Sequence, residues 1–253
     1  MHHYDTSAYD HHLGLTRDSA KGPRLDEERL KEKACNFSNP GFGKEDLKKL
    51  PADSFVLEVK FKLVTPYISK DDMGPAEEHS PIVKDWVFQV PMVRPTTWKG
   101  RLRFSAAQQN NNHDLVKRLF GTLKESEDSL EGRLHFYPTF FAPAIDGETV
   151  TRKEIINPHN RRTRRGTVPV TLTCVKENSE GTLCLLYLGP ALSETDLTTI
   201  KRAVVPWVRE MIEFHGIGAK TLKGYGLGSI SSIYIITESS KVLLLLDSEG
   251  GQQ

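Results

Sequence analysis

The sequence has few cysteines and no long apolar run. Its three cysteines, Cys35, Cys174 and Cys184, cannot build a disulfide scaffold, and without a CxxC pair they are not typical of a structural zinc site. The longest apolar run near the C-terminus, VLLLL at 242–246, is far too short to cross a bilayer. Residues 1–14 are polar and lack the apolar stretch of a secretory signal. We therefore predict a cytoplasmic protein with reduced thiols and no membrane association.

The chain also lacks an excess of one charge. Lysine and arginine total 34, aspartate and glutamate total 33, and the net charge of the 253 residues is +1. This balance excludes a protein that binds polyanions through bulk charge alone. It does not exclude a nucleic-acid partner, because cations can be gathered in a few segments. Hydrophobic residues make up 38%, which is enough for the core of one large domain or two small ones.

Composition divides the chain into three parts. Residues 1–50 carry four of the nine histidines and few β-branched residues, so we expect an irregular N-terminal extension with one short helix at 25–37. Residues 51–240 contain the apolar patterns of a folded domain. Residues 241–253 are expected to form a C-terminal tail.

Apolar periodicity predicts the elements of the folded domain. Strand patterns occur at 54–66, 132–141, 168–175, 181–189 and 228–237. We expect 168–175 and 181–189 to pair with each other. Helical patterns occur at 96–108, 115–121 and 193–216, the first with Trp98, Leu102 and Ala106 on one face, the last with Ile200, Val204, Trp207, Val208 and Met211. This order predicts an α+β domain built on an antiparallel sheet.

The segment 215–230, HGIGAKTLKGYGLGSI, is rich in glycine. It contains Gly216, Gly218, Gly224, Gly226 and Gly228, with Lys220 and Lys223 among them. Glycines permit positive φ and a close approach of ligand to backbone, so exposed N–H groups and two lysines here can bind phosphate. No P-loop pattern is present, and the helix-to-strand context is the reverse of a dinucleotide fingerprint. The other interpretation is a tight connection, for which one or two glycines would suffice.

Two further segments are basic. The segment 93–103, VRPTTWKGRLR, has no acid and carries Arg94, Lys99, Arg101 and Arg103. At a helix start capped by Thr96 or Thr97, these cations can bind phosphate oxygens. The segment 151–166 has one acid, Glu154, against Arg152, Lys153, Arg161, Arg162, Arg164 and Arg165. A solvated basic helix face explains the first segment equally well. The alternative for the second is a disordered solvated loop, although Ile155, Ile156 and Val168 favour an ordered hairpin there.

Taken together, these motifs resemble the RAMP (repeat-associated mysterious protein) superfamily of CRISPR effector subunits, in particular the RNA-backbone subunits of type III complexes. GIGAKTLKGYGLG resembles the C-terminal glycine-rich loop of that family. Lys99, Gly100 and Arg103 match its K-G-x-x-R segment, and LFG at 119–121 and SPIVKD at 80–85 also fit. The resemblance covers roughly 54–237.

The resemblance implies a ferredoxin-like fold, similar to an RNA-recognition motif. Such a fold has an antiparallel sheet, helices on one face and inserted loops, among them a β-thumb hairpin at about 142–168 that wedges between guide and target RNA. It also implies that the chain binds CRISPR guide RNA, helps to position target RNA and contacts other effector subunits. The implied RNA-binding residues are Arg94, Thr97, Lys99, Gly100, Arg101, Arg103, Arg161, Arg162, Arg164, Arg165, Gly216, Gly218, Lys220, Lys223, Gly224 and Gly226.

Family members that cut target RNA use an aspartate in the loop before the S/N-P-hydrophobic-x-K-D phrase. Here His79 directly precedes that phrase, and Asp71 and Asp72 lie earlier. An acid at this place can position a divalent metal such as Mg²⁺ or the attacking 2′-hydroxyl, and a histidine can act as a base. Asp71, Asp72 and His79 are therefore the candidate catalytic residues. The alternative is a solvated acidic loop in a subunit that does not cut.

Four functions remain open at this point. The first is a guide-RNA-binding backbone subunit, and the second is a metal-dependent endoribonuclease that cuts target RNA within the same complex. The third is a guide-RNA processing endonuclease of the same superfamily. The fourth is an α+β interaction domain that does not bind RNA.

Overall fold

The structure is a computed structural model in which parts of the chain are described. These parts are residues 16–18, 22–24, 44–69, 82–85, 90–109, 113–122, 129–141, 149–157, 162, 166, 168–189 and 194–244. For 16–18, 22–24 and 194–197 the description is limited to the backbone.

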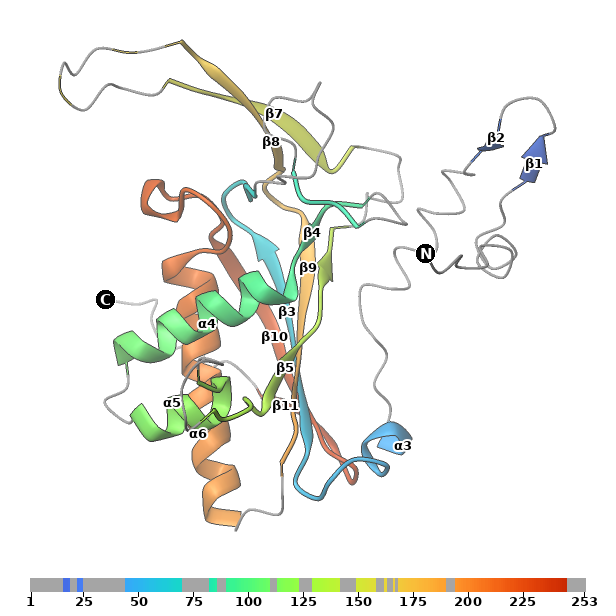
Figure 1. The fold of residues 1–253 in the computed structure, drawn as a ribbon, viewed down its shortest axis with the longest axis vertical. Coiled ribbons are helices and arrows are strands. Elements are labelled where there is room, and N and C mark those ends of the chain that lie inside the picture. The colour runs from blue at the N-terminus through green and yellow to red at the C-terminus, as the bar shows by residue number, and fades with distance from the viewer. Residues whose placement is uncertain are drawn as a thin grey trace, which may run out of the picture.

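A five-stranded antiparallel sheet forms the centre of the described residues (Figure 1). Its order is β11 (Lys241–Leu244), β10 (Gly228–Ile236), β3 (Phe55–Leu63), β9 (Glu180–Tyr187) and β5 (Leu134–Phe136). β3 is the strand that the period-two pattern predicts at 54–66. Without β11, the four strands have the 4-1-3-2 order of a ferredoxin-like β-α-β-β-α-β fold, so the predicted fold class is confirmed.

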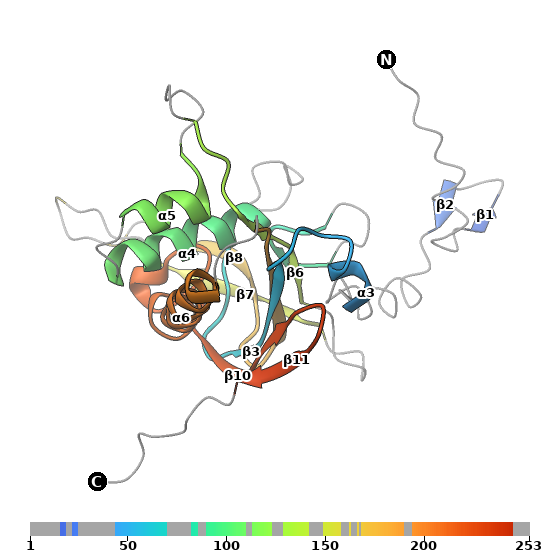
Figure 2. The same cartoon turned by 90° about the horizontal axis from the view of Figure 1, so that it is seen from below.

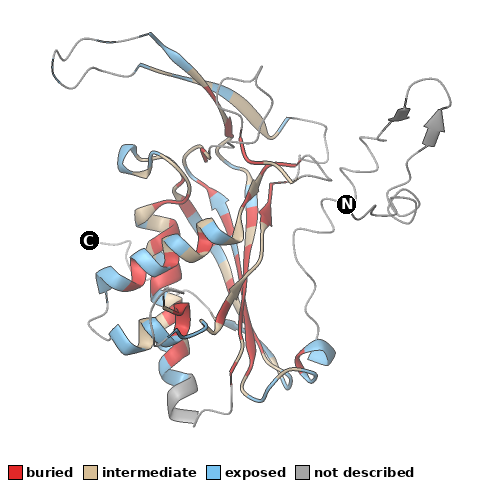
Figure 3. Ribbon diagram, viewed as in Figure 1, coloured by how far each residue is buried: buried red, intermediate tan, exposed pale blue. Residues whose placement is uncertain are grey.

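Three helices cover one face of this sheet (Figures 1 and 2). They are α4 (Pro95–Gln109), α5 (His113–Phe120) and α6 (Glu194–Glu210), and α6 continues into a π-helical turn, η1 (Met211–His215). The apolar stripes predicted on 96–108 and 193–216 are buried, and together with the inner face of the sheet they form the core (Figure 3). A buried hydroxyl also joins the helices, because Ser105 Oγ of α4 donates to the Trp207 carbonyl of α6 at 2.9 Å.

The predicted pairing of 168–175 with 181–189 is wrong. β8 (Val170–Val175) pairs with β7 (Thr151–Ile156) to form a separate hairpin, whereas β9 pairs with β3 and β5. The chain changes sheets at Asn178, whose φ is +68° and whose N–H donates to the Leu63 carbonyl at 2.7 Å. Strand pairing of this kind depends on contacts that are distant in sequence, which periodicity alone does not specify.

Other elements differ in extent from the predictions. The strand expected at 132–141 is divided into β5 and β6 (Thr139–Phe140), and β6 pairs with β4 (Met92–Val93). The segment assigned to the tail begins with β11, which adds a strand to the edge of the sheet at β10. The N-terminal fifty residues contain β1 (Thr16–Asp18), β2 (Gly22–Arg24) and α3 (Lys44–Leu47), and the helix expected at 25–37 lies outside the described residues.

The second face of the sheet is covered in part by α3. Leu47 of this helix packs against Val56, Cys184 and Ile236, on the side opposite to α4 and α6 (Figure 2). Cys184 is buried there, and burial raises the pKa of its thiol to about 12. In the described parts of the chain, no helix is long and apolar enough to span a membrane.

Candidate nucleic-acid interface

The basic segment 93–103 runs from the last residue of β4 through Arg94 into the first part of α4. Trp98 fixes this helix to the body of the protein, because its indole Nε1 donates to Thr139 Oγ1 at 3.1 Å and its ring makes an edge contact with Phe61. With one face of the helix buried in this way, the cations lie on the others: Arg103 is exposed, and Arg94 and Lys99 are partly exposed. Gly100 is also exposed on this surface.

Arg101 differs from the other cations of α4. Its guanidinium group donates to the backbone carbonyls of His215 at 2.6 Å and Gly216 at 2.9 Å. These carbonyls end the π-helical turn, so a cation here stabilises the negative end of a helix and satisfies its carbonyls. Burial lowers the pKa of Arg101. The structure thus gives Arg101 a role in joining α4 to the glycine-rich segment, which no local sequence pattern signals.

The glycine-rich segment follows directly from η1 and contains the 3₁₀ turn η2 (Thr221–Lys223). Three of its glycines have positive φ and lie against other backbone atoms. A Cβ at Gly226 would lie 1.9 Å from the Ile217 carbonyl oxygen, and a Cβ at Gly218 would lie 2.3 Å from that of Ile68. A Cβ at Gly216 would lie 2.7 Å from the Tyr225 carbonyl oxygen. Close packing within the protein therefore explains these glycines without a ligand.

Backbone hydrogen bonds close the same segment. Ile217 N–H donates to the Gly226 carbonyl at 2.8 Å, Ala219 N–H to Ile68 at 2.7 Å, and Gly226 N–H to Pro66 at 2.9 Å. Those three N–H groups are used inside the protein, so they cannot also cradle an anion. What the segment offers outward is its turn, where Lys220 and Lys223 are exposed on either side of the exposed Leu222.

The hairpin β7–β8 projects from the same end of the molecule as the glycine-rich segment (Figure 1). Its base is anchored by backbone hydrogen bonds between Tyr67 and Val175 at 3.1 and 2.9 Å. A small apolar cluster of Ile68, Leu172 and Cys174 extends the anchor to Tyr225 and Ala219. Further along, Ile155 and Val168 are 70% and 80% exposed.

A hydrogen bond links the hairpin to the glycine-rich segment. The Tyr225 hydroxyl donates to Glu154 Oε1 at 3.1 Å. Burial is the main cause that raises the pKa of Tyr225, and this hydrogen bond raises it further. Arg152 forms ion pairs with Glu154 at 3.2 Å and Glu177 at 3.1 Å, so this cation has partners within the protein. These contacts place the base of the hairpin against the loop.

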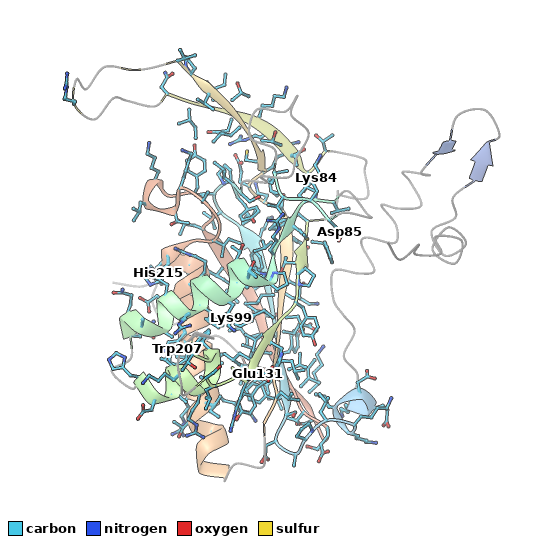
Figure 4. All side chains as sticks on the ribbon, in the orientation of Figure 1. Lys84, Asp85, Lys99, Glu131, Trp207 and His215 are labelled. Atoms are coloured by element: carbon cyan, nitrogen blue, oxygen red, sulfur yellow. The ribbon has the colours of Figure 1, made fainter. Side chains whose placement is uncertain are left out.

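The predicted site residues fall into two groups. α4, η1 and the glycine-rich segment bring Arg94, Thr97, Lys99, Gly100, Arg101, Arg103, Gly216, Gly218, Lys220, Lys223, Gly224 and Gly226 to the helix side and one end of the sheet (Figure 4, which labels Lys99 and His215). Of the hairpin arginines, Arg162 is described and exposed, whereas Arg161, Arg164 and Arg165 lie outside the described residues.

The candidate catalytic residues Asp71, Asp72 and His79 also lie outside the described residues. The described part of the chain resumes at Ile82 and Val83, which are both buried. The Val83 N–H donates to Ser69 Oγ at 2.9 Å. Within the described parts, no group of three or more His, Cys, Asp or Glu residues is placed to hold a metal ion.

Comparison with known proteins gives a family match and a fold match. The sequence model of the RAMP superfamily matches residues 60–229. One chain of a cryo-EM structure of a type III-B Cmr-beta complex bound to cognate target RNA is similar, with a TM-score of 0.58, 16% identity and coverage of 91% of this chain and 82% of that one. A chain of the apo type III-B Cmr-beta structure gives a TM-score of 0.51 and 9% identity, covering 70% of this chain and 96% of that one. No curated protein matches the sequence.

Proposed function

The chain belongs to the RAMP superfamily, and on that basis we propose that it is a guide-RNA-binding backbone subunit of a type III CRISPR interference ribonucleoprotein. In this role it holds the guide RNA, helps to position target RNA and contacts other subunits of the effector complex. The similar Cmr-beta chains come from complexes of this class, one of them bound to target RNA.

One observation carries the proposal. The matched region, 60–229, includes both α4 and the glycine-rich segment, and Arg101 ties these two elements together through the His215 and Gly216 carbonyls. Arg103 of α4 and Lys220 and Lys223 of the loop are exposed, and Lys99 of α4 is partly exposed, so these cations lie on the two elements that Arg101 joins. Cations held on joined elements suit the phosphates of an RNA strand.

The hairpin β7–β8 supports the same function in a different way. Its exposed apolar residues, Ile155 and Val168, stand beyond the anchored base. An apolar wedge can separate neighbouring bases, and the adjacent arginines can bind the backbone. We propose that this hairpin, with strands at 151–156 and 170–175, acts as the thumb between guide and target.

A salt titration tests the RNA-binding role. The full chain and the variant Lys99→Ala/Arg103→Ala are titrated with a labelled single-stranded RNA of the CRISPR repeat at several salt concentrations. For single strands, each lost phosphate contact reduces the magnitude of the negative slope of log K against log salt by about 0.7. The variant should therefore bind RNA more weakly, and its affinity should depend less on salt.

The matched control removes the same charge from another place. Lys48→Ala/Lys49→Ala changes exposed residues just after α3, on the opposite side of the sheet, and should bind RNA as the wild type does. Failure of the wild type to bind RNA at low salt would contradict the proposal. Equal losses in both double variants would show nonspecific attraction instead.

Cleavage of target RNA by this subunit stays a separate prediction that rests on the sequence. In the assembled complex with Mg²⁺, Asp71→Ala or Asp72→Ala should abolish periodic cuts if these acids position a metal or the attacking hydroxyl. Unchanged cut positions in both variants would refute the catalytic assignment and leave the guide-binding role intact.

A further inference from the structure

Gly100 lies in the middle of α4, where no steric contact in the described fold requires a glycine. A glycine inside a helix is less stable than alanine there, because it loses more backbone entropy on folding. At Gly218 and Gly226, backbone atoms would clash with a Cβ, but at Gly100 no atom of the described residues, apart from the neighbouring residues and the helix's own backbone, lies within 4 Å of the position a Cβ would take. Gly100 is exposed, so the space above it is open to solvent.

Phe104 lies one helical turn after this glycine and is 45% exposed. Helical side chains lean toward the N-terminus of the helix, over residues three and four positions earlier. The Phe104 ring accordingly covers Arg101, whose guanidinium carbon is 5.3 Å from the ring centroid. Because Gly100 has no side chain, the flank of the ring toward this residue is left uncovered.

The ring is held in place from inside the protein. His215 makes an edge contact with it, with centroids 5.2 Å apart and planes at 77°. Arg101 is itself fixed by its two hydrogen bonds to the end of η1. His215 Nε2 lies 3.3 Å from Glu210 Oε1 without hydrogen-bond geometry, so the imidazole is held mainly by its position at the end of the turn. The result is a half-exposed aromatic ring that is contacted by both Arg101 and His215.

Cations run alongside this ring. Lys99 and Arg103 are four residues apart, so they form a ridge on α4 next to the ridge of Gly100 and Phe104. A ridge of positive charge beside an exposed aromatic face matches the two parts of a nucleotide, its phosphate and its base. Lysine, unlike arginine, is depleted at protein interfaces, so Lys99 beside the ring favours a nucleotide over a protein surface.

We propose that Phe104 is a stacking platform for one nucleobase of the bound RNA, with Gly100 as the notch that lets the nucleotide approach α4. Lys99 and Arg103 bind the adjoining phosphates. This inference rests on the proposed RNA-binding function and adds to it a specific base contact.

A cycle of variants and ligands tests the platform. The full-length wild type and Phe104→Ala are titrated with a single-stranded RNA and with an abasic ribose-phosphate strand of equal length. Since stacking of one base on an aromatic side chain is worth roughly a tenfold change in affinity or more, Phe104→Ala should weaken RNA binding by that factor. The variant and the wild type should bind the abasic strand equally.

Two further variants keep the test independent of folding. Gly100→Ala should unfold at the same temperature as the wild type or a higher one, yet bind RNA more weakly, because the new methyl group fills the notch. Phe214→Ala is the matched control: this ring is 74% exposed, adjacent to His215 in sequence and not part of the platform, and its loss should leave RNA affinity unchanged.

Several outcomes would overturn the inference. If the wild type binds RNA and Phe104→Ala binds it equally well, the platform is refuted while the RNA-binding function stands. If Phe104→Ala loses equal affinity for RNA and for the abasic strand, the ring supports the backbone contact and not a base. If the variant loses association with neighbouring subunits but not with RNA, Phe104 belongs to a protein interface. If the wild type does not bind RNA, both proposals fall.

Discussion

The glycine-rich segment and the hairpin β7–β8 are neighbours of opposite construction. In the former, backbone groups pack against backbone groups: its N–H groups donate to Gly226 within the segment and to Pro66 and Ile68 outside it, and three glycines leave no room for a side chain. In the latter, two strands hold each other and the apolar side chains Ile155 and Val168 face solvent. An isolated two-stranded ribbon is marginally stable, so the hairpin depends on its anchored base.

The difference separates two tasks in RNA binding. A segment that is held by backbone hydrogen bonds can keep its two lysines at a constant position, which suits contacts with RNA phosphates. A projecting hairpin gains reach, and its exposed apolar residues suit insertion between bases. The Tyr225–Glu154 hydrogen bond joins the two, so the wedge starts from a fixed point on the loop.

The largest expected effect is on the closed segment. At Gly226, φ is +75° and a Cβ would meet the Ile217 carbonyl oxygen at 1.9 Å. Gly226→Ala should therefore lower the free energy of unfolding by about 3 kcal/mol or more, through left-handed strain and overpacking. Denaturant unfolding measures this change.

Gly224→Ala is the control for that experiment. Gly224 has a similar φ of +81°, but apart from its chain neighbours no described residue has an atom within 4 Å of its Cβ position, so only the strain of about 1 kcal/mol applies. Equal unfolding midpoints for Gly226→Ala and the wild type would show that the segment is not closed as described.

The next effect concerns the link between α4 and the loop. Arg101→Ala removes two charge-assisted hydrogen bonds to the His215 and Gly216 carbonyls and should cost about 2 kcal/mol of stability. Arg103→Ala, two residues later and exposed, should change stability by less than about 0.5 kcal/mol. Thermal unfolding of both variants measures the difference.

RNA titration of the same two variants sharpens the comparison. Arg103→Ala should lose RNA affinity without loss of stability, because its side chain points to solvent. If Arg101→Ala proves as stable as the wild type, the guanidinium does not hold the end of η1, and it would be available for RNA as the basic cluster alone suggests.

The smallest effect on stability is expected along the hairpin. Ile155 is 70% exposed, so Ile155→Ser should change the free energy of unfolding by less than about 0.5 kcal/mol. Its neighbour Ile156 packs against the Ile68–Leu172–Cys174 cluster, and Ile156→Ser should cost about 1–2 kcal/mol. Unfolding by denaturant distinguishes the two, and a larger cost at Ile155 would mean that the hairpin is covered by another part of the protein.

Periodicity in the sequence predicted the main elements well. β3, α4, α6 and β10 form where the apolar patterns place them, and the stripes on α4 and α6 are buried as expected. A strand or helix that buries one face has apolar residues at the spacing of that face, so the pattern is visible in its own sequence. The pairing of β8 with β9 was wrong because partners are chosen by contacts between distant segments, here Val175 with Tyr67 and Asn178 with Leu63.

The places where this protein gathers glycine and positive charge can be found from its amino-acid sequence, since both are properties of short segments. How each of these residues is used depends on contacts formed in the folded chain. Four cations in 93–103 are alike in sequence, yet Arg101 turns inward to carbonyls 114 and 115 residues away while Arg103 stays exposed. Likewise, Gly226 is required by the backbone that packs against it, and Gly100 is not. The reason is physical: a hydrogen bond or a steric contact needs a second group, and only folding brings that group within reach.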